Sequence, residues 1–198
     1  MSFFDDLFRE NQQVMAILRG MAPERTAELA KRAWDLGIRA VEVPIATPEA
    51  EESLRAAVRA GDGRPVGAGT VVTPEQVRAA AAIGASFTVA PGLDADVVRA
   101  GDDLDLPHLP GVATPSEIQR ANRLGLRWLK AFPATALGTE WFSAMRGPFP
   151  GIELVATGGI GARNAPEYLR AGASVVAVGS ALEDPEQLPA LAELVGQQ

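Results

Sequence analysis

Residues 40–90 read AVEVPIATPEAEESLRAAVRAGDGRPVGAGTVVTPEQVRAAAAIGASFTVA, and their pattern decides the fold. Three short, mostly apolar runs, at Ala40–Val43, Pro65–Ala68 and Phe87–Ala90, predict β-strands. The segments between them, Pro48–Ala60 and Pro74–Ile83, each begin at a Pro that follows Thr and end next to a Gly, as helices do. Because such runs are typical of strands buried on both faces, the pattern predicts parallel strands covered by helices.

The same alternation continues to both ends of the chain. Further strands are predicted at Val14–Leu18, Leu106–Leu109, Trp128–Phe132, Ile152–Ala156 and Val175–Val178, and further helices at Pro23–Leu36, Ala95–Ala100, Pro115–Leu124, Glu140–Arg146, Ala165–Ala171 and Pro185–Val195. Eight units of about 20–25 residues predict a (β/α)8 barrel (a TIM barrel), formed by a single α/β domain over residues 1–198. A doubly wound open sheet is the alternative. Met1–Asn11 is expected to form a short N-terminal helix that caps the closed end of the barrel, with Phe3, Phe4, Leu7 and Phe8 on one face.

Composition and charge narrow the functional classes. The 198 residues include no Cys, which excludes disulfides, thiolate nucleophiles, sulfur-ligated zinc and iron–sulfur clusters and favours a reducing compartment. Neither a signal peptide nor an apolar run of about 20 residues is evident, so a cytoplasmic protein without a membrane partner is expected. The net charge of −7 argues against a nucleic-acid partner. An anionic small molecule remains compatible with it, because a few local cations outweigh a weak, screened global field.

In a barrel of this type, loops at the carboxyl ends of the strands form the working face. The candidate site residues are therefore those at predicted strand ends: Arg19, Glu42, Thr70, Pro91, Lys130, Phe132, Thr157, Gly158, Gly159, Gly179 and Ser180.

Lys130 lies in the apolar strand segment LRWLKAFP, and Glu42 lies in the apolar strand AVEV. Burial disfavours an ammonium ion, and an uncharged amine attacks carbonyl groups. Glu42 is a candidate proton carrier with a raised pKa. The alternatives are a Lys130 that extends its ammonium to solvent or pairs with a carboxylate, and a Glu42 that forms a buried ion pair, for example with Arg19. Together the two residues supply the amine and the carboxylate that imine chemistry requires.

The remaining candidates indicate an anionic substrate. The guanidinium of Arg19 can hold a carboxylate through two parallel hydrogen bonds, although it can also simply support the rim. The loops that contain Gly158-Gly159 and Gly179-Ser180 can surround a phosphate with backbone N–H groups, or either one can be a plain turn.

Other motifs point away from cofactors. Gly67-Ala68-Gly69-Thr70 lacks the third glycine of a dinucleotide-binding loop and is better explained as a tight turn that presents Thr70. His108 is the sole histidine, so a multi-histidine metal site is excluded, and we interpret it as a packing or surface residue. Asp102, Asp103 and Asp105 are interpreted as a solvated acidic loop. No metal and no cofactor are expected, which leaves an imine as the means of stabilising a carbanion.

A series of motifs, in order along the chain, resembles the 2-keto-3-deoxy-6-phosphogluconate (KDPG) and 4-hydroxy-2-oxoglutarate (KHG) aldolase family. The motifs are AILRG (16–20), VEV (41–43), GAGTV (67–71), APG (90–92), LPGVATPSE (109–117), LKAFPA (129–134), MRGPFP (145–150), ATGGI (156–160) and VGSAL (178–182). The resemblance implies a class I, Schiff-base pyruvate aldolase that acts on a phosphorylated keto acid, typically as a homotrimer. It implies that Lys130 forms the imine and that Glu42 transfers protons. It also implies that Thr70, Pro91 and Phe132 surround pyruvate, and that Gly158, Gly159 and Ser180 bind phosphate.

One departure from the family pattern affects the substrate. Some relatives carry an arginine for the pyruvate carboxylate four residues after the glutamate, where this chain has Ala46, and others place it in the first strand, as Arg19 is here. Galactonate-specific relatives share the AILRG pattern, whereas Thr157 resembles the gluconate enzymes. The expected reaction is cleavage of KDPG to pyruvate and D-glyceraldehyde 3-phosphate. The alternatives are the galactonate epimer or KHG as substrate, a phosphate-binding barrel isomerase, and a non-enzymatic sensor or scaffold.

Overall fold

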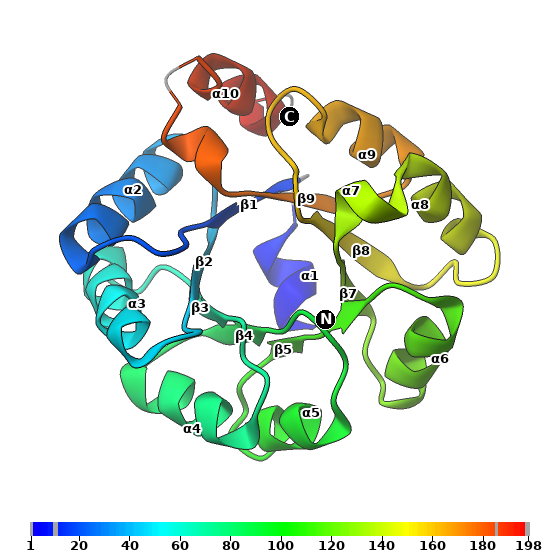
Figure 1. Cartoon of the computed structure of the whole chain (residues 1–198), viewed down its shortest axis with the longest axis horizontal. Coiled ribbons are helices and arrows are strands. Elements are labelled where there is room, and N and C mark those ends of the chain that lie inside the picture. Colours follow the sequence, from blue (N-terminus) through cyan, green and yellow to red (C-terminus); the bar gives the residue numbers. More distant parts are fainter. Residues whose placement is uncertain (1, 10–11, 185, 197–198) are drawn as a thin grey trace.

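Parallel strands form one sheet at the centre of the computed structural model, which describes residues 2–9, 12–184 and 186–196. Within these residues the sheet has nine strands in the order β5-β4-β3-β2-β1-β9-β8-β7-β6, and helices surround it (Figure 1). The strands are β1 (Val14–Ile17), β2 (Ala40–Pro44), β3 (Val66–Gly69), β4 (Phe87–Val89), β5 (His108–Leu109), β6 (Gly111–Val112), β7 (Trp128–Ala131), β8 (Glu153–Thr157) and β9 (Val175–Val178).

The strand predicted at Leu106–Leu109 is divided in the structure. Pro110 separates β5 from β6, so β5 pairs with β4 while β6 pairs with β7. Proline has no N–H to donate to a ladder, which explains the interruption, but its carbonyl still accepts a hydrogen bond from Lys130 N at 2.8 Å. The divided strand therefore joins the two ends of the sheet. The barrel prediction is confirmed, with nine strand segments in the described residues where eight were predicted.

Most helices form where the sequence predicts them. Their bounds are α2 (Pro23–Asp35), α3 (Pro48–Gly61), α4 (Pro74–Ile83), α5 (Ala95–Asp102), α6 (Pro115–Arg123), α8 (Thr139–Arg146), α9 (Ala165–Ala171) and α10 (Leu188–Gly196). Thr73 caps α4 with its side chain, and Thr114 caps α6 in the same way, each beside a Pro in the first turn. The short helices α7 (Ala134–Leu137) and η1 (Ser180–Leu182) were not predicted. The predicted start of the last helix, Pro185, lies outside the described residues.

Helix α1 (Phe3–Leu7) is seen through the centre of the ring of strands in Figure 1, and its side chains pack against the inner layer of the barrel, in agreement with the predicted N-terminal cap. Phe4, Leu7 and Phe8 are buried against inward-facing residues of the strands, including Phe87 and Trp128. The Phe4 and Phe87 rings meet edge to face with centroids 5.8 Å apart, and Phe8 lies 5.0 Å from Trp128. These aromatic side chains fill the amino-terminal end of the barrel interior.

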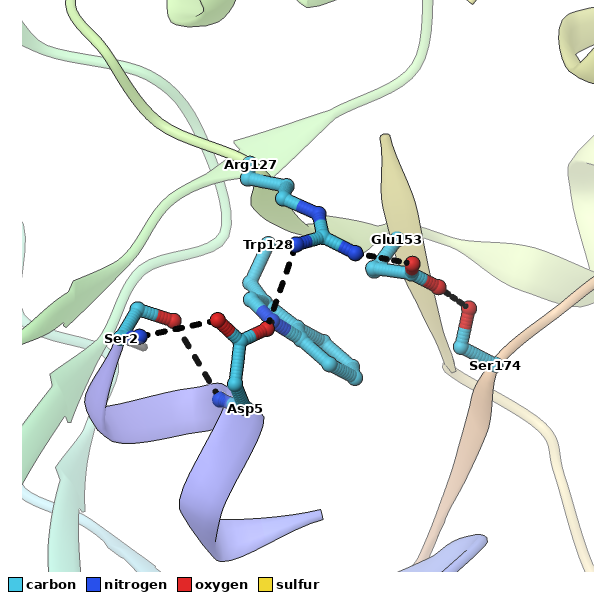
Figure 2. A network of polar contacts seen from close by, with 6 residues as sticks. All are labelled: Ser2, Asp5, Arg127, Trp128, Glu153 and Ser174. Carbon is cyan, nitrogen blue, oxygen red and sulfur yellow. Dashed lines mark hydrogen bonds and ion pairs between the residues drawn. The ribbon is translucent and has the colours of Figure 1, made fainter. Parts of the chain in front are cut away.

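A polar network attaches this helix to β7 and β8 (Figure 2). Trp128 Nε1 donates to Asp5 Oδ1 at 2.9 Å, and Arg127 extends the network to Glu153, with Nη2 3.0 Å from Oε1. Ser174 Oγ donates to the other oxygen of Glu153 at 2.6 Å. The hydrogen bond from Trp128, and then the one from the Ser2 N–H, lower the pKa of Asp5 to about 2. The network closes one end of the barrel and leaves the other end for a site.

Alternation along the strands separates two apolar layers. Side chains such as Met15, Ala40 and Trp128 pack inside the barrel. The side chains at the alternate positions of the same strands point outward and pack beneath the helices. Glu42 lies two residues after Ala40, and Lys130 lies two residues after Trp128, so both polar side chains point into the barrel. In the described residues, no helix is both long enough and apolar enough to cross a membrane.

Candidate active site

Lys130 and Glu42 meet inside the barrel, above the apolar inner layer. Lys130 Nζ lies 3.9 Å from Glu42 Oε1, and the two residues are 2% and 0% exposed. They come from β7 and β2, which are separated in the sheet by three other strands, so the contact is made across the barrel interior. The ammonium group also lies 5.3 Å from the centroid of the Phe132 ring, close enough for a cation–π interaction. The sequence named both residues, and the structure brings them together.

The carboxyl group of Glu42 is suited to exchanging a proton. Burial raises its pKa above the ordinary value of 4.5, while the positive charges of Lys130 and then Arg19 oppose the rise. Within the described part of the chain, neither carboxyl oxygen has a hydrogen-bond partner. The ion-pair partner of Glu42 is Lys130 rather than the Arg19 considered from the sequence. A buried carboxyl group with a raised pKa and no hydrogen-bond partner on either oxygen can both accept and return a proton.

Gly69 makes room for this carboxyl group. A Cβ atom at Gly69 would lie 2.0 Å from Glu42 Oε1 and 2.8 Å from Glu42 Cγ, a separation no side chain tolerates. Thr70 follows with a φ of 59°, in the left-handed region that β-branched residues avoid. The sequence interpretation identified the turn and Thr70, but the need for glycine at position 69 becomes visible only with the Glu42 side chain in place.

A cavity of about 800 Å³ opens beside Lys130. Eight of the predicted site residues line it: Arg19, Lys130, Phe132, Thr157, Gly158, Gly159, Gly179 and Ser180. Glu42 reaches it through its contact with Lys130. Thr70 and Pro91 follow β3 and β4 and are not among the described residues that line it. Residues that the sequence analysis did not name also line the cavity, notably Met21, Ile160, Arg163, Asn164, Glu183 and Gln187.

The loop after β8 is held in one conformation. Gly158 and Gly159 have φ values of 101° and 76°, which favour glycine, and a Cβ at Gly159 would lie 2.6 Å from Thr135. Asn164 Oδ1 accepts from Gly161 N at 2.9 Å, and its Nδ2 donates to the Gly159 carbonyl at 3.0 Å. The loop therefore presents a rigid wall to the cavity.

His108 and the acidic residues at the end of α5 do not line the cavity, as the sequence analysis expected. His108 is 6% exposed, and its Nδ1 lies 2.8 Å from Thr88 Oγ1, so it is a packing residue. Burial lowers the pKa of His108 to about 4. Asp102, Asp103 and Asp105 are exposed at the end of α5.

Fold and cavity together define a barrel enzyme with a buried amine and carboxyl group at its working face. The family model for KDPG and KHG aldolases matches residues 5–193. The 2-dehydro-3-deoxy-6-phosphogalactonate aldolase of Escherichia coli (strain K12) is 36% identical over 171 residues, which are 85% of this chain and 83% of that protein. The chain belongs to the KDPG and KHG aldolase family, and it is a carbon–carbon lyase.

Two further comparisons agree with this family. The 2-dehydro-3-deoxy-phosphogluconate aldolase of Pseudomonas aeruginosa is 38% identical over 172 residues, covering 83% of this chain and 75% of that protein. The crystal structure of KDPG aldolase from Legionella pneumophila, with pyruvate captured as a covalent carbinolamine intermediate, matches with a TM-score of 0.81 and 32% identity. That match covers 92% of each chain.

Proposed function

We propose that this aldolase cleaves KDPG to pyruvate and D-glyceraldehyde 3-phosphate through an imine formed on Lys130. The observation that supports this proposal best is the 3.9 Å contact between the buried Lys130 amine and Glu42 beside an 800 Å³ cavity. An amine in such a place attacks a ketone, and a carboxyl group within reach moves the protons that each step requires.

The first half of the reaction forms the imine. The uncharged Lys130 nitrogen adds to the C2 ketone of the substrate and gives a carbinolamine. Glu42 then donates a proton to the C2 hydroxyl, which leaves as water, and the nitrogen lone pair forms a protonated imine. The raised pKa of Glu42 favours this donation, because burial stabilises the protonated carboxyl group over the ionised one.

The second half breaks the carbon–carbon bond. The ionised Glu42 accepts the proton of the C4 hydroxyl, either directly or through a water molecule, and the C4 oxygen becomes the carbonyl of glyceraldehyde 3-phosphate. The electrons of the C3–C4 bond move to the imine and give an enamine. Protonation of the enamine at C3, followed by addition of water at C2, releases pyruvate and restores the Lys130 amine.

The cavity walls fit the two anionic ends of such a substrate. Arg19 is proposed to bind the carboxylate, and its charge already reaches Glu42. The backbone at Gly158 and Gly159, together with Gly179 and Ser180 after the neighbouring strand β9, is proposed to bind the phosphate. Phe132 and Thr157 line the same cavity. Thr70 and Pro91 stay proposals as walls of the pyruvate pocket, on the family resemblance alone.

Two other substrates share this chemistry. The galactonate epimer is the first alternative. The E. coli relative is named for this substrate, and its identity to this chain is about the same as that of the gluconate enzyme of P. aeruginosa. KHG appears in the family description. Thr157 Oγ1 contacts the Val155 carbonyl at 3.4 Å and lines the cavity, where its hydroxyl can contact a sugar hydroxyl. Thr157→Val is therefore expected to lower kcat/KM more for the gluconate compound than for its epimer, and parallel assays of the three substrates check this.

Borohydride trapping tests the imine itself. The chain holds only two lysines, Lys31 on an exposed helix face and Lys130, so Lys31→Ala is a matched control. Reduction in the presence of pyruvate should add a carboxyethyl group to the Lys130 peptide in the wild type and in the control. Lys130→Met should show no adduct and no cleavage, with an unchanged circular dichroism spectrum. A wild type without an adduct at Lys130 would contradict the proposal.

We further propose a homotrimer in the cytoplasm. The trimer rests on the family resemblance, and the location rests on the cysteine-free composition. Analytical ultracentrifugation should give three times the monomer mass.

A further inference from the structure

Arg163 is a cation of the cavity that the proposed mechanism does not use. It follows the Gly158-Gly159 loop and lines the same cavity as Lys130, with an exposed side chain. Among residues 2–9, 12–184 and 186–196, no carboxylate lies at ion-pair distance from its guanidinium group. Its charge is therefore available to a ligand.

The backbone around Arg163 is fixed by its neighbours. The Gly161 N–H donates to Asn164 Oδ1 at 2.9 Å, and the Ala162 N–H donates to Gln187 Oε1 at 3.2 Å. These two amide groups are thus engaged by side chains and do not face an anion. The contacts tie the loop to the segment before α10, so the Arg163 side chain starts from a rigid position on the cavity wall.

A positive charge at this end of the cavity would strengthen the binding of a phosphorylated substrate. A phosphate monoester carries a charge of about −1.5 to −2 at neutral pH. The groups proposed above to bind it, at Gly158, Gly159 and Ser180, are uncharged. The other two cations of the cavity have other partners, since Lys130 pairs with Glu42 and Arg19 is proposed for the carboxylate. Arg163 is the cation nearest in sequence to the glycine pair, and its planar fork matches phosphate oxygens.

The charge of Arg163 already acts on a neighbouring acid. The pKa of Asp184 lies below its ordinary value, first because Gln187 donates a hydrogen bond to it, then because of the Glu186 N–H, and also because Arg163 lies near. Asp184 Oδ2 accepts from Gln187 Nε2 at 2.8 Å, and Gln187 in turn holds the loop of Arg163. Arg163 is therefore connected to the segment before α10 in two ways, through its charge near Asp184 and through the hydrogen bond of Gln187 to its loop.

We propose that Arg163 selects phosphorylated keto acids over unphosphorylated ones by pairing with the substrate phosphate. This inference rests on the proposed function, because it assumes cleavage of a phosphorylated keto acid in this cavity. Arg163 is a binding residue and takes no part in the imine chemistry, so its removal should leave the reaction of pyruvate itself intact.

The test compares two reactions of the same protein. One is the cleavage of KDPG. The other is the exchange of pyruvate methyl protons in D2O, followed by NMR, which requires the imine and enamine but no phosphate. Arg163→Gln removes the charge, and Arg170→Gln removes an exposed arginine of α9 that does not line this cavity.

For Arg163→Gln, the ratio of kcat/KM for KDPG to the exchange rate should fall about 10- to 100-fold, mainly through KM. Arg163→Lys, which keeps the charge without the fork, should restore part of the ratio. Arg170→Gln should leave the ratio unchanged. The inference is overturned if this ratio falls less than about fivefold in Arg163→Gln. A variant that misfolds and loses both reactions equally leaves the ratio unchanged and counts as this outcome. A wild type that shows no exchange overturns the proposed function instead, so the two failures are distinguishable.

Discussion

His108 should make this protein lose stability in mild acid. The imidazole is buried beneath the helices, where Nδ1 contacts Thr88 Oγ1 at 2.8 Å and Nε2 has no hydrogen-bond partner among the described residues. A protonated ring would carry two N–H donors and a charge into this place. Burial therefore lowers the pKa from its ordinary value of 6.5 to about 4.

The sign and size of the effect follow from these two pKa values. As pH falls below about 6.5, the unfolded chain binds a proton at His108 before the folded chain does, so the free energy of unfolding falls. The contribution is complete above about pH 6.5 and lost by about pH 4, and it amounts to about 3 kcal/mol over the whole window. Between pH 7 and pH 5 the expected loss is about 2 kcal/mol.

Urea unfolding of the wild type and of His108→Asn at several pH values measures this contribution. The difference between the two proteins cancels the titration of the carboxyl groups, including Glu42, whose raised pKa acts in the opposite direction. Because the chain has a single histidine, the imidazole signal in a proton NMR titration also gives its pKa directly. A midpoint near 6.5, or a stability difference that is flat from pH 7 to pH 5, would refute the reasoning.

Three substitutions test other parts of the structure. Gly69→Ala places a Cβ 2.0 Å from Glu42 Oε1 and should lower kcat/KM about 100-fold, so full activity in a steady-state assay would contradict the geometry. Asp5→Ala removes the acceptor of Trp128 Nε1 and should cost about 1–3 kcal/mol of unfolding free energy, which an unchanged urea midpoint would disprove. Thr70→Gly relieves a β-branched residue at φ 59° and should raise the free energy of unfolding by about 1 kcal/mol, measured in the same way; a destabilised variant would count against strain at this turn.

The barrel could be predicted because its signals are local. Pro48 and Pro74 begin helices in the sequence and in the structure, since the fixed φ of proline suits a first helical turn whatever surrounds it. The interruption at Pro110 was not predicted. The residues on both sides of this proline are apolar, and such a pattern fits a single strand as well as a strand that is followed by a loop. Its role in closing the sheet depends on which neighbours pair with each half.

The candidate site was predicted in part. Lys130 and Glu42 stood out because charged residues are rare in apolar strands. Arg163 and Gln187 did not stand out, because polar residues in loops are ordinary there. The requirement for glycine at position 69 was also missed, since it comes from a side chain on the neighbouring strand.

The sequence alone thus determines the order of the elements and the two faces of each strand, because propensity and alternation act over a few residues. It also supplies the residue types that imine chemistry needs. The 3.9 Å approach of Lys130 to Glu42, and the assembly of separate loops into one cavity, were decided only by the closed barrel. The physical reason is that twist and register bring β2 and β7 to face each other across an interior that excludes water. A distance between residues 42 and 130 is a property of that closure and not of either segment.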